Sequence, residues 1–172
     1  MNFFRHRSLG LLAPALLIAV AGCSTADDNA AVAVPSPDAK TAKVCRELHR
    51  VLPSKLDGHG RNDPEPRSAY TAGWGNAAII LRCGVTRPPK MIDPKVAEGA
   101  DPDAIAGGVD GVDWLMEKQG DGSWRFTTAN RTAYVQVSLA KGMSAQEEGS
   151  TVLTDLAASV RKAIPKGIAS MR

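Results

Sequence analysis

Residues 77–85, Ala-Ala-Ile-Ile-Leu-Arg-Cys-Gly-Val, predict a β-strand with two different faces. Ile79, Leu81 and Cys83 recur at every second position, which is the side-chain period of a strand. Ile80 and Arg82 occupy the alternate positions and belong to the opposite face. We therefore expect the face of Cys83 to be buried and Arg82 to lie on the other face.

Residues 36–52 predict a helix that packs against this strand. Ser36 offers an N-cap directly before a proline, and Pro53 ends the pattern. Apolar residues recur at three- and four-residue steps, and they place Cys45 on the buried side. Cys45 and Cys83 are thus expected to meet. A disulfide between them would stabilise the fold by about 3 to 4 kcal/mol in the chain-entropy model.

The remainder of the chain predicts three more strands and a second helix. The strands are expected over residues 112–116, 124–128 and 133–139, and the helix over residues 150–164. Residues 54–75 and 86–111 are rich in proline and glycine and are expected to be loops. The order predicts an α+β two-layer domain, with an antiparallel sheet of about four strands and an N-terminal and a C-terminal helix packed on one face.

Several short segments together resemble a known family. They are residues 70–75 (Tyr-Thr-Ala-Gly-Trp-Gly), 79–85, 111–115 (Gly-Val-Asp-Trp-Leu), 125–128 (Arg-Phe-Thr-Thr) and 131–135 (Arg-Thr-Ala-Tyr-Val). The chain is similar over about residues 34–165 to an uncharacterised actinobacterial family of secreted or lipid-anchored proteins, known only as a domain of unknown function. The resemblance implies export and an envelope setting. It transfers no catalytic residue.

The N-terminus predicts a bacterial lipoprotein signal. Arg5 and Arg7 give a positively charged start, and residues 9–20 form an apolar run that is too short to span a bilayer comfortably. Residues 20–23, Val-Ala-Gly-Cys, match the lipobox, in which small residues precede a cysteine. We expect Cys23 to be the first residue of the mature protein and to carry a diacylglycerol with acyl chains such as palmitate.

This signal divides the chain into three parts. Residues 1–22 are the predicted signal peptide, residues 23–35 a flexible tether without periodicity, and residues 36–172 a single globular α+β domain. The predicted location is the extracytoplasmic face of the cell membrane, where the lipid is the anchor. The chain has three cysteines, so lipidation of Cys23 leaves Cys45 and Cys83 as a pair in an oxidising compartment.

The charge balance argues against a nucleic-acid partner. The chain has 21 basic and 18 acidic residues, and removal of Arg5 and Arg7 with the signal leaves 19 basic against 18 acidic residues. A nucleic-acid-binding protein would keep a concentrated basic surface after processing. No second apolar stretch of spanning length follows Cys23 in the sequence.

The sequence contains no recognisable catalytic or metal-binding motif. Gly-x-Ser-x-Gly is absent, and the mature chain offers only His49 and His59 beside the paired cysteines. The aspartates of residues 101–113 lack the ligand spacing of a calcium loop. We therefore predict no metal and no cofactor. One catalytic alternative stays open, because Cys45 and His49 lie one helical turn apart and a free thiol there could act as a nucleophile.

A candidate ligand surface is expected around Tyr70, Trp74 and Arg82. The alternative for Tyr70 and Trp74 is that the rings plug the end of the core, with Trp74 buried. The two aromatic rings stand in a glycine-flanked segment that leads into the first strand. Rings can stack on a ligand, and a planar guanidinium can pair with a carboxylate or phosphate.

Together these patterns predict a lipid-anchored, extracytoplasmic binding or accessory module of the bacterial cell envelope. Its expected partners are the membrane, through the lipid, and a cell-wall polymer or an envelope protein. One alternative is an envelope enzyme, a thiol- or carboxylate-dependent hydrolase, which would need a free Cys45 in the thiol case. The other is a structural partner of an envelope protein, with an exposed apolar patch on the sheet face away from the helices.

Overall fold

A computed structural model describes residues 32–169. The predicted signal peptide 1–22, the predicted lipidation site Cys23 and residues 24–31 of the predicted tether lie outside the described residues. Within residues 32–169, none of the helices has the length and apolar character needed to cross a membrane.

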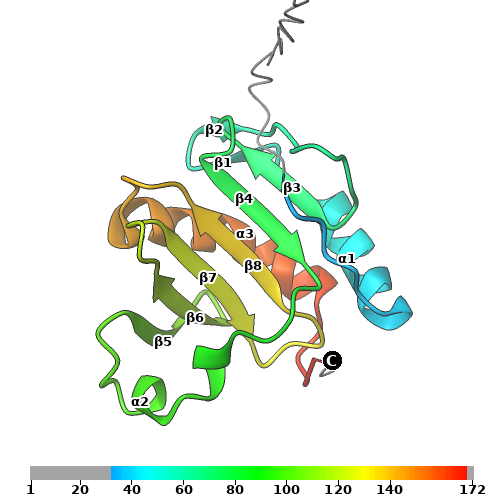
Figure 1. The fold of residues 1–172 in the computed structure, drawn as a ribbon. Helices are drawn as coiled ribbons and strands as arrows, with labels where there is room; N and C mark the ends of the chain where they lie inside the picture. The colour runs from blue at the N-terminus through cyan, green and yellow to red at the C-terminus, as the bar shows by residue number, and fades with distance from the viewer. Residues whose placement is uncertain (1–31, 170–172) are drawn as a thin grey trace, which may run out of the picture.

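Six antiparallel strands make up the main sheet, in the order β3-β4-β8-β7-β6-β5 (Figure 1). The strands are β3 (Thr71–Trp74), β4 (Ile79–Cys83), β5 (Ala104–Val109), β6 (Val112–Lys118), β7 (Trp124–Ala129) and β8 (Val135–Leu139). The predicted α+β class with an antiparallel sheet is confirmed, but the prediction of about four strands is wrong. The two additional strands, β3 and β5, form the edges of the sheet.

Both edge strands lie in segments that the sequence predicted as loops. β3 is short and runs between turn residues, and β5 contains the consecutive glycines Gly107 and Gly108, so neither shows a clear two-residue alternation. A second, two-stranded sheet, β1 (Lys55–Leu56) with β2 (His59–Gly60), also falls in a predicted loop. Pairing with neighbouring strands therefore stabilises strand structure that the local pattern does not specify.

Two long helices, α1 (Ala39–Val51) and α3 (Ser150–Ala163), contact each other and lie behind the sheet in Figure 1. A single π-helical turn, η2 (Ala145–Gly149), precedes α3. The N-cap of α1 is Asp38 and not Ser36, because the Asp38 carboxylate accepts a hydrogen bond of 2.8 Å from the backbone N–H of Thr41.

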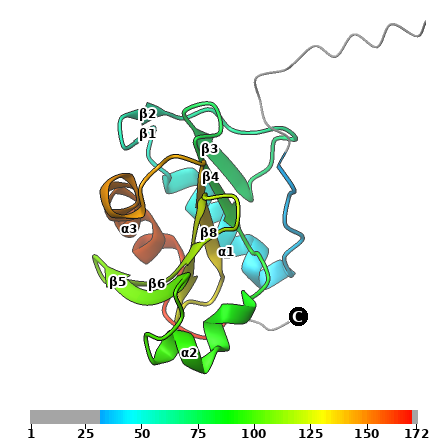
Figure 2. The ribbon, with the colours of Figure 1, turned by 60° about the vertical axis from the view of Figure 1, so that its left-hand side comes forward.

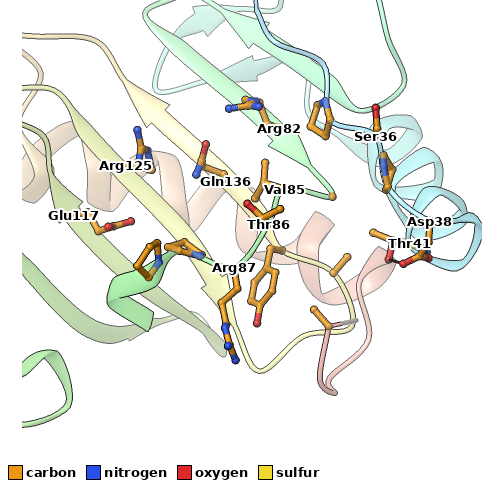
Figure 3. Close-up of a pocket in the computed structure, with 18 residues that line it drawn as sticks. Ser36, Asp38, Thr41, Arg82, Val85, Thr86, Arg87, Glu117, Arg125 and Gln136 are labelled. Carbon is orange, nitrogen blue, oxygen red and sulfur yellow. Dashed lines mark hydrogen bonds between the residues drawn. The ribbon is translucent and has the colours of Figure 1, made fainter. Parts of the chain in front are cut away.

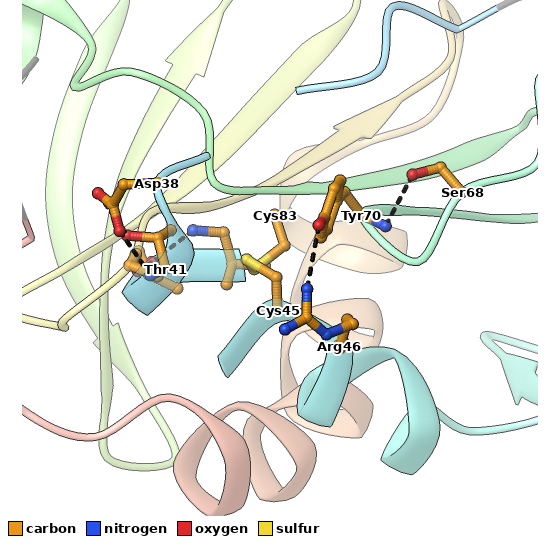
Figure 4. Close-up of a disulfide and its surroundings, with 10 residues drawn as sticks. Asp38, Thr41, Cys45, Arg46, Ser68, Tyr70 and Cys83 are labelled. Atoms are coloured by element: carbon orange, nitrogen blue, oxygen red, sulfur yellow. Dashed lines mark hydrogen bonds between the residues drawn. A yellow bond between two sulfur atoms is a disulfide. The ribbon is translucent and has the colours of Figure 1, made fainter. Parts of the chain in front are cut away.

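The hydrophobic core fills the space between these helices and one face of the sheet. It combines residues of α1, of α3 and of the strands, and its largest fully buried side chains include Trp74, Trp114 and Phe126. The predicted disulfide between Cys45 and Cys83 is present, with 5.5 Å between the Cα atoms (Figure 4). It joins α1 to β4 inside this core.

The opposite face of the sheet carries helices of its own, so the prediction of helices on one face only is incomplete. η1 (Pro89–Ile92) and α2 (Pro94–Ala97) pack on Ala104 and Leu115, which belong to the second face of β5 and β6. Figure 2 shows α2 apart from α3, at the end of the sheet that β5 and β6 form. η1 and α2 thus cover the second face mainly near β5 and β6.

The last residues of the predicted tether also lie against the domain. The backbone N–H of Val32 donates to the carbonyl oxygen of Glu65 at 3.0 Å, and Pro35 is buried. Residues 32–35 are therefore ordered on the domain and lead directly into the N-cap of α1.

Candidate functional site

The second face of the sheet holds a cavity of about 630 Å³ (Figure 3). It is bounded by strands β4, β6, β7 and β8, by the segment that precedes α1, and by residues 84–89, which connect β4 to η1. A cavity of this size is within the range of small-molecule sites. A second pocket, of about 210 Å³, is formed by η1, α2 and the mostly apolar side chains beneath them.

Four polar side chains from adjacent strands face the larger cavity. We call this set, Arg82 of β4, Gln136 of β8, Arg125 of β7 and Glu117 of β6, the polar row. Arg82 is the register partner of Gln136, and Arg125 is the register partner of Glu117. Figure 3 shows the four side chains next to one another across the sheet, with Ser36, Asp38 and Thr41 on the other side of Val85 and Thr86.

The strand alternation explains why these residues share one face. In β4 the core side chains are Ile79, Leu81 and Cys83, so Arg82 must point away from the core. The same alternation holds in β8, where Val135 and Val137 enter the core on either side of Gln136.

Buried polar atoms without a partner concentrate on this face. Within residues 32–169, six buried side-chain nitrogen or oxygen atoms have no hydrogen-bond partner: Thr71 Oγ1, Arg82 Nε, Trp114 Nε1, Glu117 Oε2, Thr127 Oγ1 and Thr132 Oγ1. The cross-strand pairs place four of them, Thr71, Arg82, Glu117 and Thr127, on the second face. Because an unsatisfied buried polar atom costs about 1 to 3 kcal/mol, this concentration calls for an explanation.

The charges of the polar row are not neutralised by close pairing. Neither Arg82, Arg125 nor Glu117 forms an ion pair within residues 32–169. Burial, and secondarily the positive charge of Arg125, lower the pKa of Arg82. Burial raises the pKa of Glu117, which is only 7 % exposed, although the positive charges of Arg125 and Lys90 act in the opposite direction.

Lys90 does not neutralise Glu117 through a salt bridge. Its ammonium group lies 2.9 Å from Asp101 Oδ1, and this pairing raises the pKa of Lys90 and lowers that of Asp101. Glu117 therefore keeps Arg125, directly across the strand pair, as its nearest cationic neighbour in the sheet.

Gly84 shapes the wall of the cavity beside α1. Its φ angle is +85°, and a Cβ atom at this position would lie 2.7 Å from Pro37 Cβ. Glycine allows both the positive φ and the close approach of the two segments. The segment that precedes α1 can therefore close one side of the cavity.

The structure does not bring the three residues of the predicted ligand surface together. Arg82 lines the cavity, whereas Trp74 is fully buried in the core and donates its indole N–H to the carbonyl oxygen of Pro53 at 3.1 Å. Tyr70 is half-buried, and its hydroxyl accepts a hydrogen bond of 3.2 Å from Arg46 of α1 (Figure 4). Tyr70 and Trp74 are thus on the helix side of the sheet and Arg82 is on the other.

Three members of the polar row were not singled out from the sequence. Alternation within each strand can place Gln136, Arg125 and Glu117 away from the core. However, the strand order is needed to bring them next to Arg82, because β4 pairs with β8 across more than fifty intervening residues. The isolated strand patterns carry no information about that order.

The candidate catalytic pair does not have a free thiol. Cys45 is bonded to Cys83, and His49 contacts other side chains. Its Nε2 lies 2.8 Å from Arg61 Nη2 and 3.6 Å from Asp63 Oδ2, while burial, and secondarily the charge of Arg61, lower its pKa. Within the part of the chain that the structure describes, no group of three or more His, Cys, Asp or Glu side chains could hold a metal ion.

The fold and the cavity define an α+β domain with a binding-sized site on the second face of its sheet. The chain belongs to the family described as Protein of unknown function (DUF3515), whose model matches residues 8–169. The predicted membership of an uncharacterised family is therefore confirmed, and the match includes Cys23 as well as the domain. No curated protein and no solved structure matches the chain.

Proposed function

We propose that this protein is a lipid-anchored, extracytoplasmic binding or accessory module of the bacterial cell envelope, and that its ligand occupies the cavity over the polar row. In the predicted mature form, the acylated Cys23 holds the chain at the membrane. The ligand is a component of the surrounding envelope, either a cell-wall polymer or a part of an envelope protein.

The proposed location is supported by the lipobox and by the disulfide. Residues 20–23 have the residue types that lipoprotein processing requires, and they follow a positively charged start and an apolar run. Cys45 and Cys83 are bonded and fully buried, as expected for a stabilising bridge in an oxidising compartment. Residues 24–31 separate the lipidation site from the first described residue and give the domain reach from the membrane.

The proposed binding role depends on one observation, the concentration of unpaired buried polar groups at a cavity. Arg82 and Glu117 both line the cavity, and each has a buried polar atom without a partner. A bound ligand would supply the missing hydrogen bonds, and this gain would favour its binding. Binding residues that are carried on adjacent strands are also held rigidly by the ladder of backbone hydrogen bonds.

The thiol-dependent enzyme and the structural partner have less support from the structure than the binding role, whereas a carboxylate-dependent hydrolase stays an open alternative. A thiol-dependent enzyme needs Cys45 as a free nucleophile, but Cys45 is bonded to Cys83. A structural partner would have an apolar patch on the second face of the sheet. Within residues 32–169, the exposed large hydrophobic residues are Ile92, Ile105 and Ile168, and the part of that face that lines the cavity carries the polar row.

The proposal is tested by blocking the cavity without changing its charge. Gln136→Phe places a ring among the polar row, whereas the matched control Thr154→Phe places the same ring on the exposed side of α3. The processed, acylated protein is purified in detergent micelles and mixed with the insoluble cell-wall fraction and with solubilised envelope proteins. Cosedimentation and affinity capture then report binding to each fraction.

We expect the wild-type protein and Thr154→Phe to bind one of the two fractions and Gln136→Phe to lose that binding while keeping its melting temperature. Equal binding by all three proteins would mean that the cavity is not the site. Absence of binding by the wild-type protein to both fractions would contradict the proposed function.

A further inference from the structure

We propose that the cavity recognises an oxyanion, a carboxylate or a phosphate, and holds it between Arg82 and Arg125. The inference rests on the proposed function, because it names the chemistry of the ligand for the same cavity. It is carried by the placement of two arginines on one face of the sheet, neither of which forms an ion pair within residues 32–169.

The strand register sets the spacing of the two guanidinium groups. Arg82 is on β4 and Arg125 is on β7, with β8 between them. The two residues are offset along the strands, because Arg82 is the register partner of Gln136 and Arg125 is the register partner of Ser138. Neighbouring strands are about 4.8 Å apart and each strand residue rises about 3.4 Å, so the Cα atoms of the two arginines are on the order of 12 Å apart. Two arginine side chains of ordinary length can reach a common group at the middle of that span, above the part of β8 between Gln136 and Ser138.

The free protein holds these two cations close enough to affect each other. The positive charge of Arg125 contributes to the lowered pKa of Arg82, which means that the two guanidinium groups repel each other. No carboxylate within the described residues forms an ion pair with either group. An oxyanion placed between them would remove the repulsion and accept hydrogen bonds from both, in the geometry that guanidinium groups favour.

The surroundings of the two arginines add specificity. Gln136 is directly beside Arg82 on β8 and diagonal to Arg125, and it can donate an amide hydrogen to the same anion. Glu117 borders Arg125 on the far side, where its negative charge opposes an anion. The charged groups that act on Glu117 are Arg125, Lys90 and Asp101. Because the negative charge of Glu117 repels an anion, an oxyanion is expected to bind closer to Arg82 than to Glu117.

The experiment compares acids with neutral molecules of the same shape. The processed protein in detergent micelles is titrated calorimetrically with N-acetylglycine and with its amide, and with glycerol phosphate and with glycerol. The two acids distinguish a carboxylate ligand from a phosphate ligand. The wild-type comparison of acid with neutral partner requires no variant and therefore does not depend on how any variant folds.

The variants Arg82→Gln and Arg125→Gln each remove one guanidinium group from the polar row. Arg46→Gln is the matched control, because Arg46 is exposed on α1, on the opposite side of the sheet, and loses the same charge. We expect at least one acid to bind more tightly than its neutral partner. Each polar-row variant is expected to weaken that acid about ten- to a hundredfold, as for the loss of charge-assisted hydrogen bonds, and Arg46→Gln to change it by less than about twofold.

Equal affinity of each acid and its neutral partner would overturn the oxyanion inference. An equal loss of affinity for an acid in Arg46→Gln and in Arg82→Gln would overturn it as well. If envelope binding is lost in Gln136→Phe but kept in both polar-row arginine variants, the proposed function stands and the oxyanion inference is wrong. If the acids bind as expected but no envelope fraction does, the anion site stands and the proposed function is wrong.

Discussion

Glu117 is a buried carboxyl group whose position costs stability in the unliganded protein. Its side chain is 7 % exposed, Oε2 has no hydrogen-bond partner, and burial raises its pKa. A carboxyl group with a raised pKa in the folded state binds its proton more tightly when folded than when unfolded. The stability that this proton provides is present at low pH and is lost as the pH rises through the pKa of the folded state.

Replacement of Glu117 by glutamine is therefore expected to stabilise the free protein at pH 7. The amide has the shape of the carboxyl group without its charge, and the expected gain is about 0.5 to 2 kcal/mol. Near pH 4, where the wild-type carboxyl group is largely protonated, the gain should shrink towards zero. Urea unfolding at both pH values measures this gain in the free energy of unfolding. Glu98→Gln is the control, because Glu98 is exposed. A gain that is the same at both pH values would contradict the account.

At the scale of residues, the sequence predicted the face of the sheet on which a side chain lies. It was less informative about which groups surround that side chain in the fold. The alternation in residues 77–85 correctly separated Arg82 from Cys83, because the two faces of a strand differ in burial. Trp74 was harder to place. Its indole N–H needs a polar partner as well as apolar surroundings, and the partner is a backbone carbonyl, that of Pro53, which no residue pattern reveals.

At the scale of elements, the disulfide connects two elements that are each predictable from periodicity. Cys45 and Leu48 share the buried side of α1, and Cys83 and Leu81 share the core face of β4. The sequence separation of the two cysteines is 38 residues, so the bridge removes considerable freedom from the unfolded chain.

Replacement of Cys45 by serine, with Cys83 also replaced to avoid a free thiol, is expected to lower the free energy of unfolding by about 2 to 5 kcal/mol. Denaturant unfolding of the wild-type protein and the double variant under non-reducing conditions measures this loss. Mass spectrometry of unreduced peptides should first show Cys45 linked to Cys83 in the wild-type protein. Full thiol labelling of native wild-type protein at Cys45 would refute the bridge and restore the Cys45–His49 alternative.

The missed strand β5 shows which part of a sheet local patterns do not define. Asp110 and Gly111, with φ angles of 45° and 76°, form the tight turn between β5 and β6, and an Asp-Gly pair is a strong hairpin signal. Gly107 and Gly108 obscure the preceding strand, since glycine provides no side-chain alternation. The turn is therefore predictable from the sequence, whereas the strand before it is stabilised mainly by pairing with β6.

At the scale of the whole molecule, the fold class was predictable from the sequence, but the order of the strands in the sheet was not. The order of helices and strands predicted an α+β domain with an antiparallel sheet, because each element must bury one face. The sheet order β3-β4-β8-β7-β6-β5 places β4 next to β8, and this long-range pairing creates the polar row. The cavity is thus a property of the assembled sheet, and no single segment predicts it.

The proposed lipid anchor is a property of the whole molecule as well, because such an anchor would hold the domain at the membrane. Cys23→Ala is expected to abolish acylation and to move the protein from the detergent phase to the aqueous phase after phase partitioning. The intact mass of the wild-type protein should show a mature chain that begins at Cys23 and carries an acyl modification. Unmodified wild-type protein in the culture medium would contradict the proposed location.

The central claim, that the ligand binds at the polar row, is tested most directly by the side-chain nuclear magnetic resonance signals of the arginine Nε–H groups. The processed protein in micelles is titrated with soluble fragments released from the cell wall and, separately, with solubilised envelope proteins. We expect the signals of Arg82 and Arg125 to shift and saturate with one of these fractions. The signals of Arg46, which is part of α1, and of Arg61, which donates a hydrogen bond to the backbone carbonyl of His49 in α1, should stay in place. Saturable shifts confined to Arg46 and Arg61, with Arg82 and Arg125 unchanged, would contradict the claim.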